Sequence, residues 1–206
     1  MSNLLIVALN GSPKKDGNTF FMLDRALDTC RSLGADTVML QCREAMKELR
    51  NKFCINCESP CTAKCARGNS FENALNLLRR ADGLIIGSPV YFGTVSGQLK
   101  AFWDKTRSLR TDKSLLNVPG GALAVGGSRF GGQETTIRAI HDLMLVQGML
   151  VVGDGYGEDD CGHQGAAAQR PAEEDENGIN RTIILAKRVF EVAQATRGIR
   201  RRGVGR

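Results

Sequence analysis

Residues 4–19 of the chain, LLIVALNGSPKKDGNT, contain an apolar run, a polar turn and the beginning of an amphipathic segment. The run Leu4–Leu9 is almost wholly apolar, which is typical of a parallel strand covered on both faces. The apolar residues that follow recur every three or four positions, at Phe20, Leu23, Leu27 and Cys30. This spacing predicts a helix. A strand that enters a helix through such a turn directs backbone N–H groups and the positive end of the helix dipole at one point, which suits an anion.

The turn is rich in side chains that can donate a hydrogen bond, namely Ser12, Asn18 and Thr19. It is not the P-loop G-x-x-x-x-G-K-[ST], because five residues separate Gly11 from Gly17 and Asn18 stands where that motif has Lys. The dinucleotide fingerprint G-x-G-x-x-G is also absent. The turn fits a phosphate monoester such as the end of FMN. An ordinary strand-to-helix turn capped by Thr19 is the structural alternative.

Strand and helix patterns alternate five times along the chain. Strands are expected at residues 4–9, 37–41, 84–88, 121–126 and 149–153. Helices are expected at residues 19–33, 70–80, 95–109, 135–147 and 180–196. This alternation predicts an α/β fold with a doubly wound, five-stranded parallel sheet and helices on both faces. A length of 206 residues predicts one such domain, over residues 1–196.

Three polar loops follow three of the expected strands, at residues 10–19, 89–94 and 126–134. In doubly wound sheets, ligands bind beyond the carboxyl ends of the strands, where such loops meet. These loops are rich in small residues and in hydrogen-bond donors. Together they predict a site for a planar, phosphorylated cofactor.

Three segments lie outside the alternating pattern. Residues 42–69 are polar and hold five of the seven cysteines, so they are expected to form an insertion. Residues 154–178 are rich in glycine and end in an acidic run, and they are expected to form a surface loop. Residues 197–206 hold five arginines and no acid, so the rest of the chain is nearly neutral. They are expected to form a basic, flexible tail. Binding of nucleic acid is not expected, because no aromatic residue lies between the arginines.

No stretch of 18 apolar residues is present, so no membrane-spanning helix is expected. The first residues lack the charged n-region and the cleavage site of a signal peptide, so none is expected. A cytoplasmic location, with reduced thiols, is therefore expected.

Four cysteines lie within twelve residues, in the spacing Cys54-x2-Cys57-x3-Cys61-x3-Cys65. Four thiolates so close in one loop suit a tetrahedral sulfur site for Zn²⁺ or an iron–sulfur cluster. Structural zinc sites often use two separated pairs, so the compact spacing favours a [4Fe–4S] cluster over zinc. Cys30 is expected in the core, and Cys42, at the end of a strand, is expected to be structural. Cys161, two residues before His163, is a candidate reactive thiol, although such a lone pair is more often incidental.

The chain resembles the NADPH-dependent FMN reductase branch of the flavodoxin-like flavoproteins, and more narrowly the iron–sulfur flavoproteins. The resemblance rests on GSPKKDGNT (11–19), the four-Cys insertion, ADGLIIGSPVYFGTVSGQLKAFWDK (81–105), GGSRFGGQETT (126–136) and GMLVVG (148–153). It implies a flavodoxin-like fold with strand order 2-1-3-4-5, FMN at the carboxyl edge of the sheet, and a homodimer or homotetramer.

The resemblance also implies the residues of the site. The FMN phosphate would be held by Ser12, Asn18 and Thr19, in a loop shaped by Pro13 and Lys14. The isoalloxazine ring would lie along Pro89, Val90, Tyr91, Phe92 and Gly93. The polar edge of the ring would be contacted by Gly127, Ser128, Arg129, Gly132 and Gln133. A [4Fe–4S] cluster would be carried by Cys54, Cys57, Cys61 and Cys65. Three residues separate the second and third of these cysteines, where family members often have two.

The expected function is that of an FMN-dependent oxidoreductase in which the flavin, rather than a catalytic side chain, carries the chemistry. No Ser-His-Asp arrangement, HExxH motif or paired-carboxylate motif is evident. Electrons would pass between a small substrate and a one-electron partner such as a ferredoxin. A dehydrogenase of a small cyclic carboxylate and an NAD(P)H-linked quinone or FMN reductase are specific forms of this function. Two alternatives are a non-enzymatic electron carrier with the same cofactors, and a redox- or metal-responsive protein with zinc at the cysteines and the tail on nucleic acid.

Overall fold

The strands of the computed structural model, which describes residues 3–160 and 162–200, form one parallel sheet. The strands are β1 (Leu5–Asn10), β2 (Asp36–Gln41), β3 (Gly83–Pro89), β4 (Pro119–Gly126), β5 (Leu150–Val151) and β6 (Ala166–Gln169). The order β2-β1-β3-β4-β5 confirms the predicted arrangement, and β6 pairs with β4 outside this path. The two edges of β1 are taken by β2 and β3, so the first strand lies inside the sheet, as its apolar sequence predicts.

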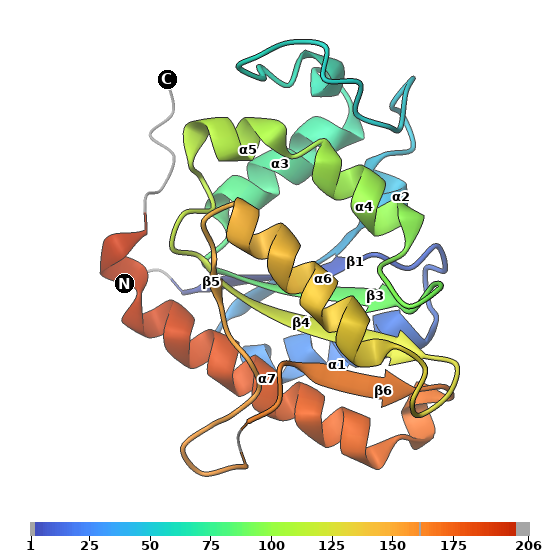
Figure 1. The fold of residues 1–206 in the computed structure, drawn as a ribbon. Coiled ribbons are helices and arrows are strands. Elements are labelled where there is room, and N and C mark those ends of the chain that lie inside the picture. Colours follow the sequence, from blue (N-terminus) through green and yellow to red (C-terminus); the bar gives the residue numbers. More distant parts are fainter. Residues whose placement is uncertain (1–2, 161, 201–206) are drawn as a thin grey trace.

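Helices cover both faces of the sheet (Figure 1). They are α1 (Asn18–Ser32), α2 (Cys42–Ala45), α3 (Ser70–Arg80), α4 (Gly97–Asp104), α5 (Arg107–Asp112), α6 (Gln133–Val146) and α7 (Glu176–Ala195). One face packs against α1 and α7, and the other against the remaining helices. Alternate residues of β1 supply the two cores: Ile6 and Ala8 point to the α1 side, and Val7 and Leu9 to the other. Within the described residues, no helix is both long enough and apolar enough to cross a membrane.

The fifth position of the sheet is shared by two short strands. Residues Leu150–Val151 pair with the beginning of β4, and residues Ala166–Gln169 pair with its end. Between them, residues 152–165 leave the sheet and return to it. The expectation of a surface loop throughout 154–178 is therefore wrong. The sequence of β6, Ala-Ala-Ala-Gln, has neither the β-branched nor the aromatic residues typical of a strand. The segment is a strand because its backbone pairs with that of β4.

Two helix boundaries differ from the prediction for local reasons. The helix expected over 95–109 is divided into α4 and α5, and the hydroxyl of Thr106 at the break donates to the Trp103 carbonyl (2.7 Å). This hydroxyl also accepts from Gln147 Nε2 (2.7 Å), so it takes part in side-chain bonds where a helix would continue. Helix α7 begins within the acidic run, because the Asp175 carboxylate accepts from the Gly178 N–H (2.9 Å) and caps the helix.

The described part of the expected tail lies against the domain. Residues Arg197–Ile199 form a 3-10 turn, and the Ile199 carbonyl accepts from Asn117 Nδ2 (2.9 Å). The guanidinium of Arg200 pairs with Asp82 at 2.8 Å, and both side chains are buried. The expected boundary at residue 196 thus falls before a segment that is fixed to the sheet. Residues 201–206, the rest of the predicted tail, lie outside the described residues.

Candidate functional site

The loops that follow β1, β3 and β4 are joined at the carboxyl edge of the sheet. The Gly11 N–H donates to the Gly87 carbonyl (2.8 Å), and the Val90 N–H donates to the Val125 carbonyl (2.9 Å). The Thr135 hydroxyl donates to the Gly93 carbonyl (2.7 Å) and so ties the start of α6 to the loop after β3. The first two bonds fix the loops after β1 and β3 to the neighbouring strand, and the third fixes the loop after β3 to α6, in agreement with the predicted convergence of the loops.

A cavity of about 250 Å³ opens between these loops. The predicted flavin residues that line it are Ser12, Lys14, Asn18, Thr19, Pro89, Val90, Tyr91 and Gly127. Two of the lining residues, Lys14 and Arg170, are cationic, and none of the lining residues is acidic. Donor groups and positive charge in one cavity favour a ligand with a phosphate.

Beneath this cavity the turn after β1 keeps hydrogen-bond donors free. The Ser12 N–H donates to Asn10 Oδ1 (2.9 Å), but the fully buried Asn10 Nδ2 has no acceptor among residues 3–160 and 162–200. Helix α1 begins after Gly17 without a side-chain cap, so Thr19 does not cap it as the structural alternative supposed. The N–H groups of its first turn are therefore available to a ligand. The residues present fit a bound phosphate.

Asn18 has a second role that its place in the loop did not indicate. Its Oδ1 atom accepts from the Ala172 N–H at 2.8 Å, across 154 positions of the sequence. The bond fixes the segment after β6 against the first turn of α1. This segment carries Arg170, a cavity residue that the sequence analysis missed. No local pattern could have revealed it, because its position depends on the pairing of β6 with β4.

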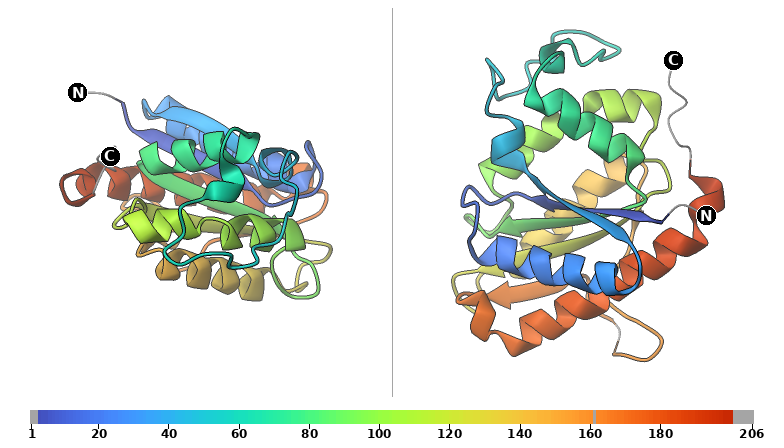
Figure 2. Two further views of the ribbon diagram at one scale, coloured as in Figure 1. Left: turned by 90° about the horizontal axis from the view of Figure 1, so that it is seen from above. Right: turned by 180° about the vertical axis from the view of Figure 1, so that it is seen from behind.

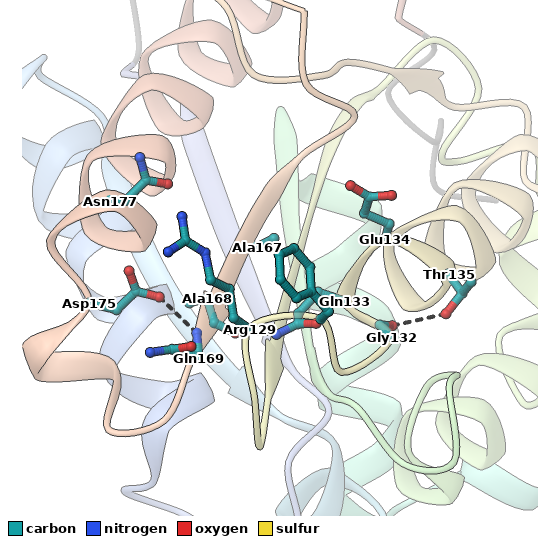
Figure 3. Close-up of a pocket in the computed structure, with 11 residues that line it drawn as sticks. Arg129, Gly132, Gln133, Glu134, Thr135, Ala167, Ala168, Gln169, Asp175 and Asn177 are labelled. Carbon is teal, nitrogen blue, oxygen red and sulfur yellow. Dashed lines mark hydrogen bonds between the residues drawn. The ribbon is translucent and has the colours of Figure 1, made fainter.

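A second pocket, of about 470 Å³, lies between α6, β6 and the start of α7 (Figure 3). Arg129, Gly132 and Gln133, expected at the polar edge of the flavin, line this pocket and not the first cavity. Gln133 is buried and holds the loop together: its Nε2 donates to the Ser128 carbonyl (2.6 Å), and its Oε1 accepts from the Gly131 N–H (2.8 Å). Contact of these residues with the flavin ring stays a prediction.

Exposed aromatic side chains stand beside the first cavity. Tyr91 lines it and is 44% exposed, and Phe92, the next residue, is fully exposed. The turn places Phe92 and Gly93 at positive φ and is closed by two bonds between Tyr91 and Thr94. Pro13, Phe92, Gly93 and Ser128, predicted near the cofactor, are not among the residues that line the cavity. An exposed aromatic rim suits a ring system or a partner that docks there.

The four clustered cysteines lie in the loop between α2 and α3, on the outer side of the layer of α3, α4 and α5 (Figure 2). All four are free thiols and at least partly exposed. Their donor chemistry fits zinc or an iron–sulfur cluster, but within the described ranges no group of three or more Cys, His, Asp or Glu is arranged to hold a metal ion. The loop has little core of its own, since Phe53 and Ile55 are each 70% exposed. A metal ion or cluster that binds here would therefore draw the thiols together.

Two side chains from the break between α4 and α5 touch this loop. The buried Lys105 places its Nζ 3.9 Å from the Cys65 sulfur, and the Arg107 guanidinium bonds to the Asn56 side chain. The loop is thus attached to the domain at Asn56 and at Cys65. Cys161, the other candidate reactive thiol, lies outside the described residues.

The cysteines are expected to differ sharply in reactivity. Cys30 and Cys42 have no exposed surface, and burial raises the pKa of the Cys30 thiol to about 12 and that of Cys42 well above its ordinary value. Since the thiolate is the nucleophile, iodoacetamide at pH 8 should leave both unmodified while it alkylates the four loop cysteines of the metal-free chain. Mass spectrometry of peptides gives the readout, and labelling in urea is the control. Equal labelling of Cys30 in the folded chain would contradict the buried position.

Comparison with known proteins identifies the family. The model of the NADPH-dependent FMN reductase family matches residues 4–164. The chain is 39% identical over 195 residues to an iron-sulfur flavoprotein of Methanocaldococcus jannaschii, covering 92% of this chain and 97% of that one. It is 41% identical over 81 residues to an NAD(P)H dehydrogenase (quinone) of Chromohalobacter salexigens, covering 39% and 40%. The flavodoxin, WrbA-like protein of Agrobacterium tumefaciens superposes with a TM-score of 0.68 at 19% identity, over 95% of this chain and 99% of that one, and confirms the fold. The chain therefore belongs to the NADPH-dependent FMN reductase family and is a flavin-dependent oxidoreductase with a flavodoxin-like fold.

Proposed function

We propose that the protein binds FMN in the cavity at the carboxyl edge and passes electrons between a small substrate and a one-electron partner. The observation that carries this proposal is the cavity itself. Loops after three parallel strands meet there, supply hydroxyl, amide and cationic groups, and leave Asn10 Nδ2 without an acceptor among the residues the structure describes. The family supports FMN as the occupant.

The protein groups would divide the work along the cavity. The turn after β1 and the first turn of α1 would hold the phosphate, with Ser12, Asn18 and Thr19 as side-chain donors. Pro89, Val90 and Tyr91 would lie along the ring, and their backbone is fixed by the bond from Val90 N–H to the Val125 carbonyl. When bound, FMN supplies the exchange of a hydride or of single electrons. The chain's own task is to orient the flavin and to leave one side open to the reaction partner.

Cys54, Cys57, Cys61 and Cys65 would hold a [4Fe–4S] cluster, with zinc as the less favoured occupant. The donor set and the name of the iron-sulfur flavoprotein relative support this assignment. A cluster supplies one-electron transfer when it is bound. The likeness to an NAD(P)H dehydrogenase (quinone) supports a nicotinamide or a quinone as the small substrate.

A non-enzymatic electron carrier is the second candidate, and one observation favours it. Phe92 and Phe130 are almost fully exposed beside the two pockets, which suits docking of a protein such as a ferredoxin. Turnover of NAD(P)H with a quinone would exclude the carrier. We propose a homodimer or homotetramer as the assembly, which the family resemblance implies.

The proposal is tested by an absorption spectrum of protein purified without oxygen, with iron and sulfide assayed on the same sample. We expect flavin bands, a broad shoulder in the blue, and about four irons per chain. Flavin bands without iron would leave a flavin reductase with zinc or free thiols in the loop. Protein that carries no flavin and does not bind added FMN would contradict the proposal.

Replacing Cys57 by alanine should remove the iron and leave the FMN. One thiolate of the four is lost, so the iron content should fall from about four per chain to near zero. FMN content should change by less than about twofold, because Cys57 does not line the cavity. Ser59→Ala in the same loop is the control. Loss of FMN together with iron would show that this loop also supports the flavin site.

A further inference from the structure

Arg170 is one of the two cationic residues that line the cavity proposed for FMN. It lines the cavity together with Ser12, Lys14, Asn18 and Thr19. Its guanidinium makes no hydrogen bond or ion pair with the rest of the described chain, so its donors are free for a ligand. The turn after β1 lacks the lysine with which a P-loop binds phosphate, and Asn18 occupies that position.

The backbone around Arg170 is fixed on both sides. The Arg170 N–H donates to the Gly126 carbonyl at the end of β4 (3.0 Å). Two residues later, the Ala172 N–H donates to Asn18 Oδ1 (2.8 Å). These two bonds hold the segment between the end of the sheet and the start of α1, which are the two elements that form the cavity. The Arg170 side chain therefore projects from a backbone segment that hydrogen bonds hold in place on both sides.

Gly127 lies beside the guanidinium of Arg170. A Cβ atom built on Gly127 would lie 3.7 Å from Arg170 Nε and 3.8 Å from its Cζ. A methyl group at 127 would be in ordinary van der Waals contact with the guanidinium. The loop after β4 therefore borders the side chain of Arg170, which comes from the loop after β6.

We propose that Arg170 binds the terminal phosphate of the flavin and makes the site select FMN over riboflavin; this inference rests on the proposed function. A guanidinium offers a planar fork of donors that matches a phosphate, and its charge complements a dianion. Riboflavin lacks the phosphate and gains nothing from Arg170. The charge of Arg170 therefore increases the affinity for FMN relative to the affinity for riboflavin.

The test compares the binding of FMN and riboflavin to flavin-free protein, by quenching of flavin fluorescence. Arg170→Ala should weaken FMN binding about 10- to 100-fold and change riboflavin binding less than about twofold. The FMN affinity of Arg170→Lys should lie between those of the unchanged protein and of Arg170→Ala, because lysine keeps the positive charge but lacks the planar fork of donors. The FMN affinity of the unchanged protein should fall with added salt, and that of Arg170→Ala should fall less. Arg138→Ala removes an exposed arginine on α6 that does not line the cavity and serves as the control.

The outcomes separate the inference from the proposal on which it rests. If the unchanged protein binds neither flavin, the proposed function fails. If it binds both, and Arg170→Ala weakens both to the same degree, Arg170 has a structural role only and the inference is wrong. An equal loss of FMN affinity in Arg138→Ala would show a general effect of net charge and would also overturn it.

Discussion

Replacing Arg200 by alanine should lower the free energy of unfolding by about 3–5 kcal/mol, the range for removing one partner of a buried ion pair. The Arg200 and Asp82 side chains are only 4% and 5% exposed, and the Arg200 guanidinium lies 2.8 Å from Asp82 Oδ1. The other carboxylate oxygen accepts from the Leu5 N–H at 2.9 Å, at the start of β1. Without the guanidinium, the Asp82 carboxylate stays buried next to the central strands and loses a charged hydrogen-bond donor.

Urea denaturation followed by circular dichroism measures this effect. Arg188→Ala is the matched control, because Arg188 on α7 pairs with Glu191 at 2.7 Å while both side chains are 43% and 50% exposed. A pair so exposed contributes less than about 1 kcal/mol. If the two variants were destabilised equally, the C-terminal segment would not be fixed to the sheet by Arg200.

Replacing Gly165 by alanine should lower the free energy of unfolding by about 3 kcal/mol and weaken FMN binding as well. A Cβ atom at Gly165 would lie 2.3 Å from the Ala122 carbonyl oxygen, which belongs to the middle of β4. Strand β4 is held by β3 along its other edge, so the clash is relieved only if β6 moves away. The segment that carries Arg170 follows β6 directly and would move with it.

Gly157→Ala is the control for this prediction. Gly157 lies in the same excursion between β5 and β6, and a Cβ atom there would have no atom within 4 Å. Its stability and FMN affinity should stay close to those of the unchanged protein. The measurements are urea denaturation and titration with FMN. A Gly165→Ala protein as stable as Gly157→Ala would mean that β6 does not pack against β4 as described.

The cysteine loop carries its strongest functional signal in the spacing of its cysteines. The spacing of Cys54, Cys57, Cys61 and Cys65 indicates a metal or cluster site because donor type and chain separation are both written in the sequence. The fold attaches the loop through Lys105 and Arg107 but does not gather the thiols. A site built from an irregular loop takes its geometry from the ion or cluster that it binds.

The sequence by itself determined the alternation of strands and helices, the strand order through the family resemblance, and the turn after β1. Apolar runs such as Leu4–Leu9 have one stable environment, between two layers of helices, so local composition is enough to place them. Helix α3 occupies residues 70–80, as predicted, because its apolar residues recur on one face and Asn69 caps it.

Only the tertiary structure decided the features that join distant parts of the chain. Strand β6 forms because its backbone pairs with the edge of β4. Its alanine-rich sequence does not by itself predict a strand. Arg170 lines the cavity because its own N–H bonds to the Gly126 carbonyl and the N–H of Ala172, two residues later, bonds to Asn18 Oδ1. Arg200 is buried beside Asp82, the residue that directly precedes β3. Each of these positions depends on contacts between residues far apart in the sequence, and short-range patterns contain no information about such contacts.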